Sequence, residues 1–216
     1  TKINENRIET KALYALSNTD YAFDMWFYRQ GDGTIISVGT DNNLLALSTH
    51  DNGMLRARVG GENDVYDTNV QLPAKKWMYI ALNYKRKTSP DDQNRITMLY
   101  ATSEDKEPTY VGKNVAAKDL SVHGKLGIGG DGMQGMIAEL SIWNSDITTT
   151  QLYETRTMAR ASYTQGLVGY WNMTEGHGTK ITDVARSRHM YMPSESWYIN
   201  NENRAARLSG KEGSPL

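Results

Sequence analysis

The 216-residue chain contains no cysteine, and this absence excludes disulfide bonds, thiolate metal sites and cysteine nucleophiles. No apolar stretch approaches the roughly 20 residues that a membrane-spanning helix needs, so we expect no membrane insertion. Lys and Arg total 24 against 25 Asp and Glu, and no run of basic residues suggests a surface for phosphate groups. We therefore expect no nucleic acid partner.

The chain starts without a secretory signal peptide, so it is either cytosolic or a trimmed, mature fragment. Small secreted animal domains depend on disulfides, and an extracellular domain without cysteine is commoner in bacteria. We expect a monomeric module of a larger bacterial protein, located outside the cell or on its surface.

Phenylalanine is scarce: the chain has two Phe against 13 Tyr and five Trp. Tyr and Trp combine an apolar body with a polar atom, which suits half-hydrated sheet faces and sugar-binding surfaces. A sandwich core would use the same residues, so the composition alone does not separate the two roles.

Short alternating runs separated by turn residues cover most of the chain, and sustained helical periodicity is nearly absent. In 76–84, for example, Trp77 and Tyr79 face one side while Met78 and Ile80 face the other. Residues 31–33 (Gly-Asp-Gly) predict a tight hairpin turn. One short helix is expected near 148–158, with Thr148 as its N-cap. These patterns predict an all-β fold of two antiparallel sheets.

Three phrases in order resemble one known family: KKWMYIALNYKR (75–86), KLGIGGDGMQGMIAELSIWNSDITTTQL (125–152) and GLVGYWNMTEGHG (166–178). They are similar to the laminin-G-like domains of the concanavalin A-like lectin/glucanase superfamily, of the bacterial surface-protein type. The resemblance implies a two-sheet antiparallel jelly-roll sandwich. Glu139 stands at the family's acidic position, as a buried structural carboxylate, a metal neighbour or an exposed charge. Tyr79 and Ala138 replace a His and an Asp of the family pattern.

The segment 166–216 resembles the opening of such a domain, whereas the N-terminus resembles a later strand pair. We expect residues 1–216 to form a single sandwich in which 166–216 supplies the strands missing from the N-terminus. Leu167–Trp171 and Ala205–Leu208 would then pair within it, with Trp171 buried. The alternative is a domain over 1–163 followed by the start of a second repeat.

Glycosidases of this superfamily carry alternating carboxylates in an E-x-D-x-E pattern, and this chain has none. Residues 104–107 (Glu-Asp-Lys-Glu) have the wrong spacing and lie in a polar, loop-like run. The four histidines accompany no Ser or Cys nucleophile motif. We therefore expect no enzymatic activity.

A calcium ion is the one cofactor that the resemblance suggests, because the loop with Asp131 and Gln134 is similar in position to the pentraxin calcium loop. The turns at 41–43 and 51–52 could add ligands. Asp and Asn are also common turn residues, so a purely structural role is the alternative.

Tyr191, Trp197 and Tyr198 are the candidate sugar-stacking residues. Alternatively, Trp197 closes one end of the sandwich. We expect a non-catalytic binding module whose partner is a glycan or an extracellular protein. A structural spacer without ligand and a degenerate glycoside-hydrolase-like domain are the alternatives.

Overall fold

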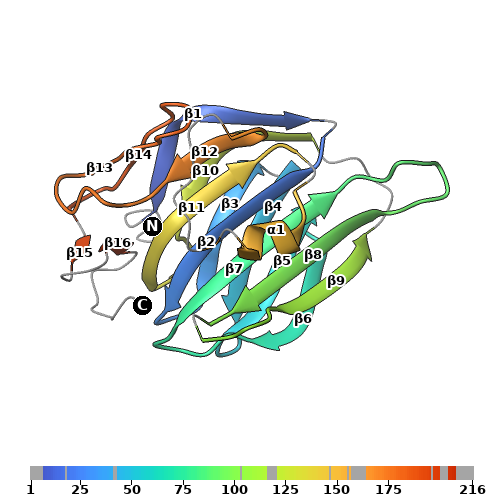
Figure 1. Ribbon diagram of the computed structural model, residues 1–216, viewed down its shortest axis with the longest axis horizontal. Helices are drawn as coiled ribbons and strands as arrows, with labels where there is room; N and C mark the ends of the chain where they lie inside the picture. Colours follow the sequence, from blue (N-terminus) through green and yellow to red (C-terminus); the bar gives the residue numbers. More distant parts are fainter. Residues whose placement is uncertain are drawn as a thin grey trace.

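Two antiparallel β-sheets pack face to face in the computed structural model, with one short helix, α1 (Thr149–Glu154), on the outside of one sheet (Figure 1). The structure describes residues 7–17, 19–40, 43–102, 104–115, 121–145, 147–154, 156, 164–195, 197–199 and 204–207. This is the all-β jelly-roll class predicted from the sequence. Among these residues, no helix is long and apolar enough to span a membrane.

The first sheet, sheet A, has the strand order β13–β14–β1–β10–β3–β4–β5–β6. In chain order its strands are β1 (Ile8–Ser17), β3 (Gly33–Thr40), β4 (Asn43–His50), β5 (Met54–Gly60), β6 (Val65–Gln71), β10 (Ser121–Ile128), β13 (Lys180–Ile181) and β14 (Met190–Tyr191).

The second sheet, sheet B, has the order β15–β16–β11–β2–β7–β8–β9, and β12 also pairs with β11. Its strands are β2 (Tyr21–Arg29), β7 (Trp77–Lys85), β8 (Asn94–Ala101), β9 (Thr109–Val115), β11 (Gly135–Trp143), β12 (Leu167–Trp171), β15 (Trp197–Ile199) and β16 (Arg204–Arg207).

The main core lies between the two sheets and follows from the alternation of side chains along each strand. In β7, Met78, Ile80 and Leu82 share one face, as predicted, and this face points into the core. Trp77 and Tyr79 point to the outer face of sheet B, where they join a second apolar cluster. The central strands of sheet B are therefore buried on both faces.

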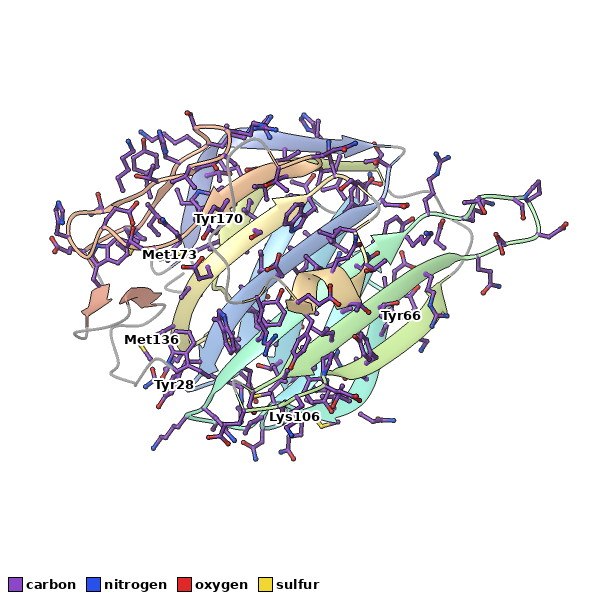
Figure 2. The ribbon with its side chains drawn as sticks, in the orientation of Figure 1. Tyr28, Tyr66, Lys106, Met136, Tyr170 and Met173 are labelled. Carbon is purple, nitrogen blue, oxygen red and sulfur yellow. The ribbon has the colours of Figure 1, made fainter. Side chains whose placement is uncertain are left out.

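The second cluster is rich in aromatic residues, and α1 covers it through Leu152 and Tyr153. Tyr28, Met136 and Tyr170 of this cluster lie along β2, β11 and β12 (Figure 2). The part of the outer face of sheet B that α1 covers is therefore closed to a ligand.

The predicted N-cap of α1 is confirmed, and it forms a reciprocal capping box. Thr148 Oγ1 accepts a hydrogen bond from the Gln151 amide at 3.1 Å, and Gln151 Oε1 accepts one from the Thr148 amide at 2.9 Å. The described helix spans Thr149–Glu154, and residues 155 and 157–163 lie outside the described part of the chain, so its expected extent to residue 158 stays a prediction.

The prediction of a hairpin at residues 31–33 is wrong. The strand before them, β2, belongs to sheet B, and the strand after them, β3, belongs to sheet A. The turn instead carries the chain across the sandwich, where Asp32 Oδ1 accepts a 3.0 Å bond from Arg29 and Asp32 Oδ2 a 2.7 Å bond from the Asn52 amide. A glycine-rich turn signals backbone freedom only, and long-range contacts decided which strands pair.

Residues after position 166 add strands to both sheets. Strand β12 pairs with β11 in the register Leu140↔Trp171, and Trp171 is fully buried. Strand β16 pairs with β11 and β15, while β13 and β14 extend sheet A beyond β1. The expected strand pairing is present; the division of the chain into domains stays a prediction.

Glu139 lies at a bulge in β11, where the register with β2 shifts between Ala138 and Ser141. Its φ of 54° is unusual for a residue with a side chain. The half-buried Glu139 carboxylate accepts a hydrogen bond from the Tyr170 hydroxyl of the neighbouring β12. This arrangement fits the structural-carboxylate interpretation of Glu139.

Candidate functional site

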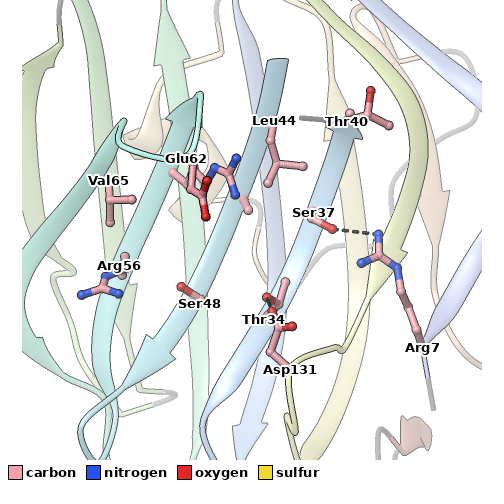
Figure 3. A pocket seen from close by; sticks show the side chains of 13 residues that line it. Arg7, Thr34, Ser37, Thr40, Leu44, Ser48, Arg56, Glu62, Val65 and Asp131 are labelled. Carbon is pink, nitrogen blue, oxygen red and sulfur yellow. Dashed lines mark hydrogen bonds between the residues drawn. The ribbon is translucent and has the colours of Figure 1, made fainter. Parts of the chain in front are cut away.

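A groove of about 460 Å³ lies on the outer face of sheet A (Figure 3). It crosses β3, β4 and β5 and reaches the turn between β5 and β6. Its lining combines three guanidinium groups with two carboxylates and several hydroxyls; the charged members are Arg7, Arg56, Arg58, Glu62 and Asp131.

Small side chains on adjacent strands form the floor of the groove. Ser37 of β3 pairs with Ala46 of β4, and Thr34 pairs with Ser48. Their chain neighbours point into the core, so alternation places these small residues on the outside. Between Leu44 and Val65, the larger apolar side chains of the lining, these small residues leave room for a ligand to lie against the sheet.

Arg7 forms one wall of the groove. Its Nη2 donates a 2.9 Å hydrogen bond to Ser37 Oγ, and its Nε lies 2.9 Å from Glu9 Oε1. The guanidinium rests on β10 at Gly127, where a Cβ would lie 2.2 Å from Arg7 Nε. The glycine therefore creates the space that Arg7 occupies.

Arg56 forms the opposite wall and is held by Asp67. Arg56 Nε and Nη2 donate to the two Asp67 oxygens at 2.6 and 3.1 Å, and His50 Nε2 lies 2.8 Å from Asp67 Oδ1. The Arg56 hydrogen bond, followed by that of His50, lowers the pKa of Asp67 below its ordinary value. Asp67 therefore stays ionised at neutral pH and keeps the Arg56 side chain in place.

The turn after β5 closes one end of the groove. Arg58 Nε donates to Gly61 O at 2.9 Å, and the Gly61 amide donates to Asp64 Oδ2 at 2.6 Å. Glu62, in the same turn, places a carboxylate on the groove rim. The end of the groove therefore offers an acceptor beside a guanidinium.

Tyr191, a predicted sugar-stacking residue, lies in line with the groove floor. It pairs with Glu9 across β14 and β1, Glu9 pairs with Gly127, and Gly127 pairs with Ser37. Directly paired residues share a face of the sheet, so half-buried Tyr191 stands on the same outer face. Lys11 Nζ lies 4.4 Å from the centre of its ring.

Trp197 does not join this surface. It is 9% exposed, packs with the main core, and donates from Nε1 to Gly178 O at 2.7 Å. This placement matches the alternative in which Trp197 closes the sandwich. The side chain of Tyr198 lies outside the described residues, so its role in sugar stacking stays a prediction.

Asp131 and Gln134 share the loop between β10 and β11, next to the groove. Asp131 Oδ2 accepts a hydrogen bond from Thr34 Oγ1, while the Gln134 carbonyl accepts bonds from the Gln30 and Gly31 amides at 2.9 and 3.0 Å. Among the described residues, no three His, Asp or Glu side chains gather as a metal centre.

Calcium takes six to eight oxygen ligands, and the one carboxylate of this loop does not complete such a shell with the described side chains. Residues 41 and 42, which were candidate ligands, lie outside the described part of the chain. Calcium at the Asp131 loop stays a prediction.

The groove arginines were not among the residues predicted from the sequence. Arg56 and Arg58 had a usable signal, because they alternate with Leu55 and Ala57 and so face the outside of a strand together. Arg7 had none, since its place depends on Gly127, which lies far along the chain.

The sequence profile of the concanavalin A-like lectin/glucanases superfamily matches residues 4–152, which is more than half of the chain. The chain belongs to this superfamily. The matched range contains the whole groove and ends within α1. Family membership therefore agrees with the laminin-G-like, concanavalin A-like resemblance of the sequence.

Among solved structures, a candidate carbohydrate binding protein from Bacteroides ovatus is similar at a TM-score of 0.63 and 15% sequence identity. The similarity covers 95% of the present chain and 62% of the Bacteroides ovatus chain. The present chain therefore spans less than two thirds of that protein. At this identity the likeness shows the fold. No curated protein matches the sequence significantly.

Proposed function

We propose that this chain is a non-catalytic carbohydrate-binding module that holds an extended glycan in the groove on the outer face of sheet A. The observation that carries the proposal is the groove itself: a small-residue floor with guanidinium, carboxylate and hydroxyl groups at its edges. Sugars present closely spaced hydroxyls, which both donate and accept hydrogen bonds, so a mixed lining suits them.

The dimensions of the surface favour an oligosaccharide over a single sugar. The Arg7 guanidinium lies over β10, and Arg56 belongs to β5. Three strand spacings, or about 14 Å, separate these two strands in sheet A. The row continues in the other direction to Tyr191, whose aromatic ring is the kind of side chain that packs on sugar rings. The lectin/glucanase fold and the similar Bacteroides ovatus structure support the same function.

The two carboxylates of the groove do not favour glycoside hydrolysis. Asp131 accepts a hydrogen bond from Thr34, which lies in the same cross-strand row as Arg56 of β5. Glu62 follows Gly60, at the other end of β5. From Arg56 to Gly60 the strand extends about 13 Å. Glycosidases hold their two carboxylates about 5–10 Å apart.

The proposal is tested by thermal unfolding of the chain with a panel of polysaccharides. A glycan at about 100 times its dissociation constant adds about 2.7 kcal/mol of apparent stability, which is a measurable shift in Tm. Ser48→Trp fills the groove floor and should abolish the shift. Thr97→Trp places the same ring at a half-buried position of β8 in sheet B and should leave it unchanged.

A shift that survives Ser48→Trp would place the glycan elsewhere on the molecule. The absence of a shift with every polysaccharide would contradict the proposed function and favour the spacer or a protein partner. We further propose that the module works outside the cell, as part of a larger bacterial protein.

A further inference from the structure

Arg7 is fixed in place before any ligand arrives. Glu9 and Ser37 hold two of its nitrogens, and the guanidinium lies over Gly127 in the space that a larger residue would fill. A side chain that is already ordered loses little conformational entropy when a ligand binds, so each new hydrogen bond contributes more to affinity.

One nitrogen of Arg7 is still available. Among the described residues, Nη2 of Arg7 donates a hydrogen bond to Ser37 and the buried Nε lies at ion-pair distance from Glu9, whereas Nη1 contacts neither residue. Ser37 accepts through its oxygen and keeps its own hydroxyl proton. Ser37 itself is only 3% exposed, so the group that this wall presents to a ligand is the charged N–H group of Arg7.

Arg7 shares its carboxylate partner with a second cation, while the other groove carboxylate on this side, Asp131, bonds to Thr34. Glu9 is the carboxylate paired with Arg7, and Lys125 Nζ also lies 3.2 Å from Glu9 Oε2. Two cations thus share one anion at this wall. On the opposite wall the Arg56 guanidinium is engaged by both oxygens of Asp67, so its charge is neutralised within the protein. An anionic group of a ligand should therefore gain the most binding free energy at the Arg7 wall.

Resting on the proposed glycan function, we infer that the groove selects a glycan that carries an anionic group, a carboxylate or a sulfate ester, and that Arg7, held by Ser37, binds this group. A planar guanidinium matches the paired oxygens of a carboxylate or a sulfate. Glu62 and Asp131, at the ends of the groove, would accept hydrogen bonds from the hydroxyls of the same chain.

The test is isothermal titration of the full chain with oligogalacturonate, a sulfated galactan and neutral dextran, at low and high salt. We expect one or both anionic glycans to bind more tightly than dextran and to weaken with salt, because screening acts on a charge pair at the surface. Carboxylate and sulfate sources are distinguished by which of the two glycans binds.

Three variants locate the anion site. Arg7→Gln should weaken binding of the anionic glycan at least about tenfold, a change of about 1.4 kcal/mol. Arg7→Lys keeps the charge but lacks the planar guanidinium, so its affinity should lie between those of wild type and Arg7→Gln. Gly127→Ala keeps Arg7 but displaces its guanidinium, since the new Cβ would lie 2.2 Å from Nε and Nη2. Arg186→Gln, in an exposed loop, is the control with the same change in net charge.

Anionic binding that survives both Arg7→Gln and Gly127→Ala, or that falls equally in Arg186→Gln, would overturn the inference. If dextran bound more tightly than the anionic glycans and Arg7→Gln left its binding unchanged, the anion-site inference would be overturned, while the proposed function would stand. Binding of no glycan by the folded protein would contradict both. Circular dichroism of each variant shows that the fold is intact.

Discussion

Trp143 and Asp24, 119 residues apart in the sequence, meet in a buried hydrogen bond in which Trp143 Nε1 donates to Asp24 Oδ1 at 2.9 Å. The Tyr79 hydroxyl contacts the other oxygen of the same carboxylate at 2.9 Å. Asp24 is fully buried and thereby links β11, β2 and β7 on the outer face of sheet B. This carboxylate organises the face that α1 covers.

Asp24→Asn should destabilise the protein by about 2–3 kcal/mol, because the amide presents one oxygen where the carboxylate presents two, and bonds to charged groups contribute most. Urea unfolding followed by Trp fluorescence measures the effect. Asp92→Asn, in the exposed loop between β7 and β8, should stay within about 0.5 kcal/mol of wild type. Equal stabilities for the two variants would show that Asp24 does not have this role.

The buried phenol of Tyr14 should lower the stability of the fold at alkaline pH. Burial, followed by the negative charge of Asp183, raises the pKa of the Tyr14 phenol above its ordinary value of 10.0. Above about pH 10 the unfolded chain releases this proton while the folded chain keeps it, so stability falls as the pH rises. Tyr14→Phe removes this contribution.

We therefore expect Tyr14→Phe to lose less stability than wild type between about pH 9 and 11 in urea unfolding experiments. Tyr110→Phe is the matched control, because Tyr110 is 45% exposed. Parallel pH profiles for wild type and Tyr14→Phe would contradict the prediction.

Ending the chain after residue 163 should give an insoluble or unfolded product, as the single-domain hypothesis requires. The truncation removes β12 and β16 from the edge of β11 and leaves Tyr14 without the ring of Trp171, whose centre lies 6.4 Å away. Exposed strand edges promote aggregation. Size-exclusion chromatography and circular dichroism measure the outcome; a folded, monomeric product would favour a separate following repeat.

Gly135→Ala should destabilise the fold by about 1–3 kcal/mol, whereas Gly127→Ala should cost much less. A Cβ at position 135 would lie 2.3 Å from the carbonyl oxygen of Tyr28, which belongs to the paired backbone of β2 and has little freedom to move. At position 127 the obstructing atoms belong to the end of the Arg7 side chain. Chemical unfolding of both variants checks the ranking, and a reversed order would contradict it.

Much of the sheet structure was predictable from local patterns. The alternation in 76–84 placed Met78 and Ile80 on one face and Trp77 and Tyr79 on the other, and the structure confirms this division. Such patterns work because a strand has a period of two whatever it pairs with. The N-cap at Thr148 was predictable because a capping box involves only residues within one turn of the chain.

The binding surface was predictable only in part. Tyr191 does stand on the outer face of sheet A, but Trp197, singled out by the same aromatic signal, is buried in the core. An aromatic residue suits both places, and its surroundings decide between them. The groove itself combines β3, β4 and β5 with Arg7, and no local pattern contains that combination.

The sequence by itself determined the strand periodicity, the all-β class and the superfamily, because these depend on residues near one another in the chain and on motifs with fixed spacing. Only the tertiary structure decided that the turn at 31–33 crosses between sheets, and that Gly127 lies beneath Arg7. Both depend on which strands pair, and that choice is made by side chains distant in the sequence that bury one common core.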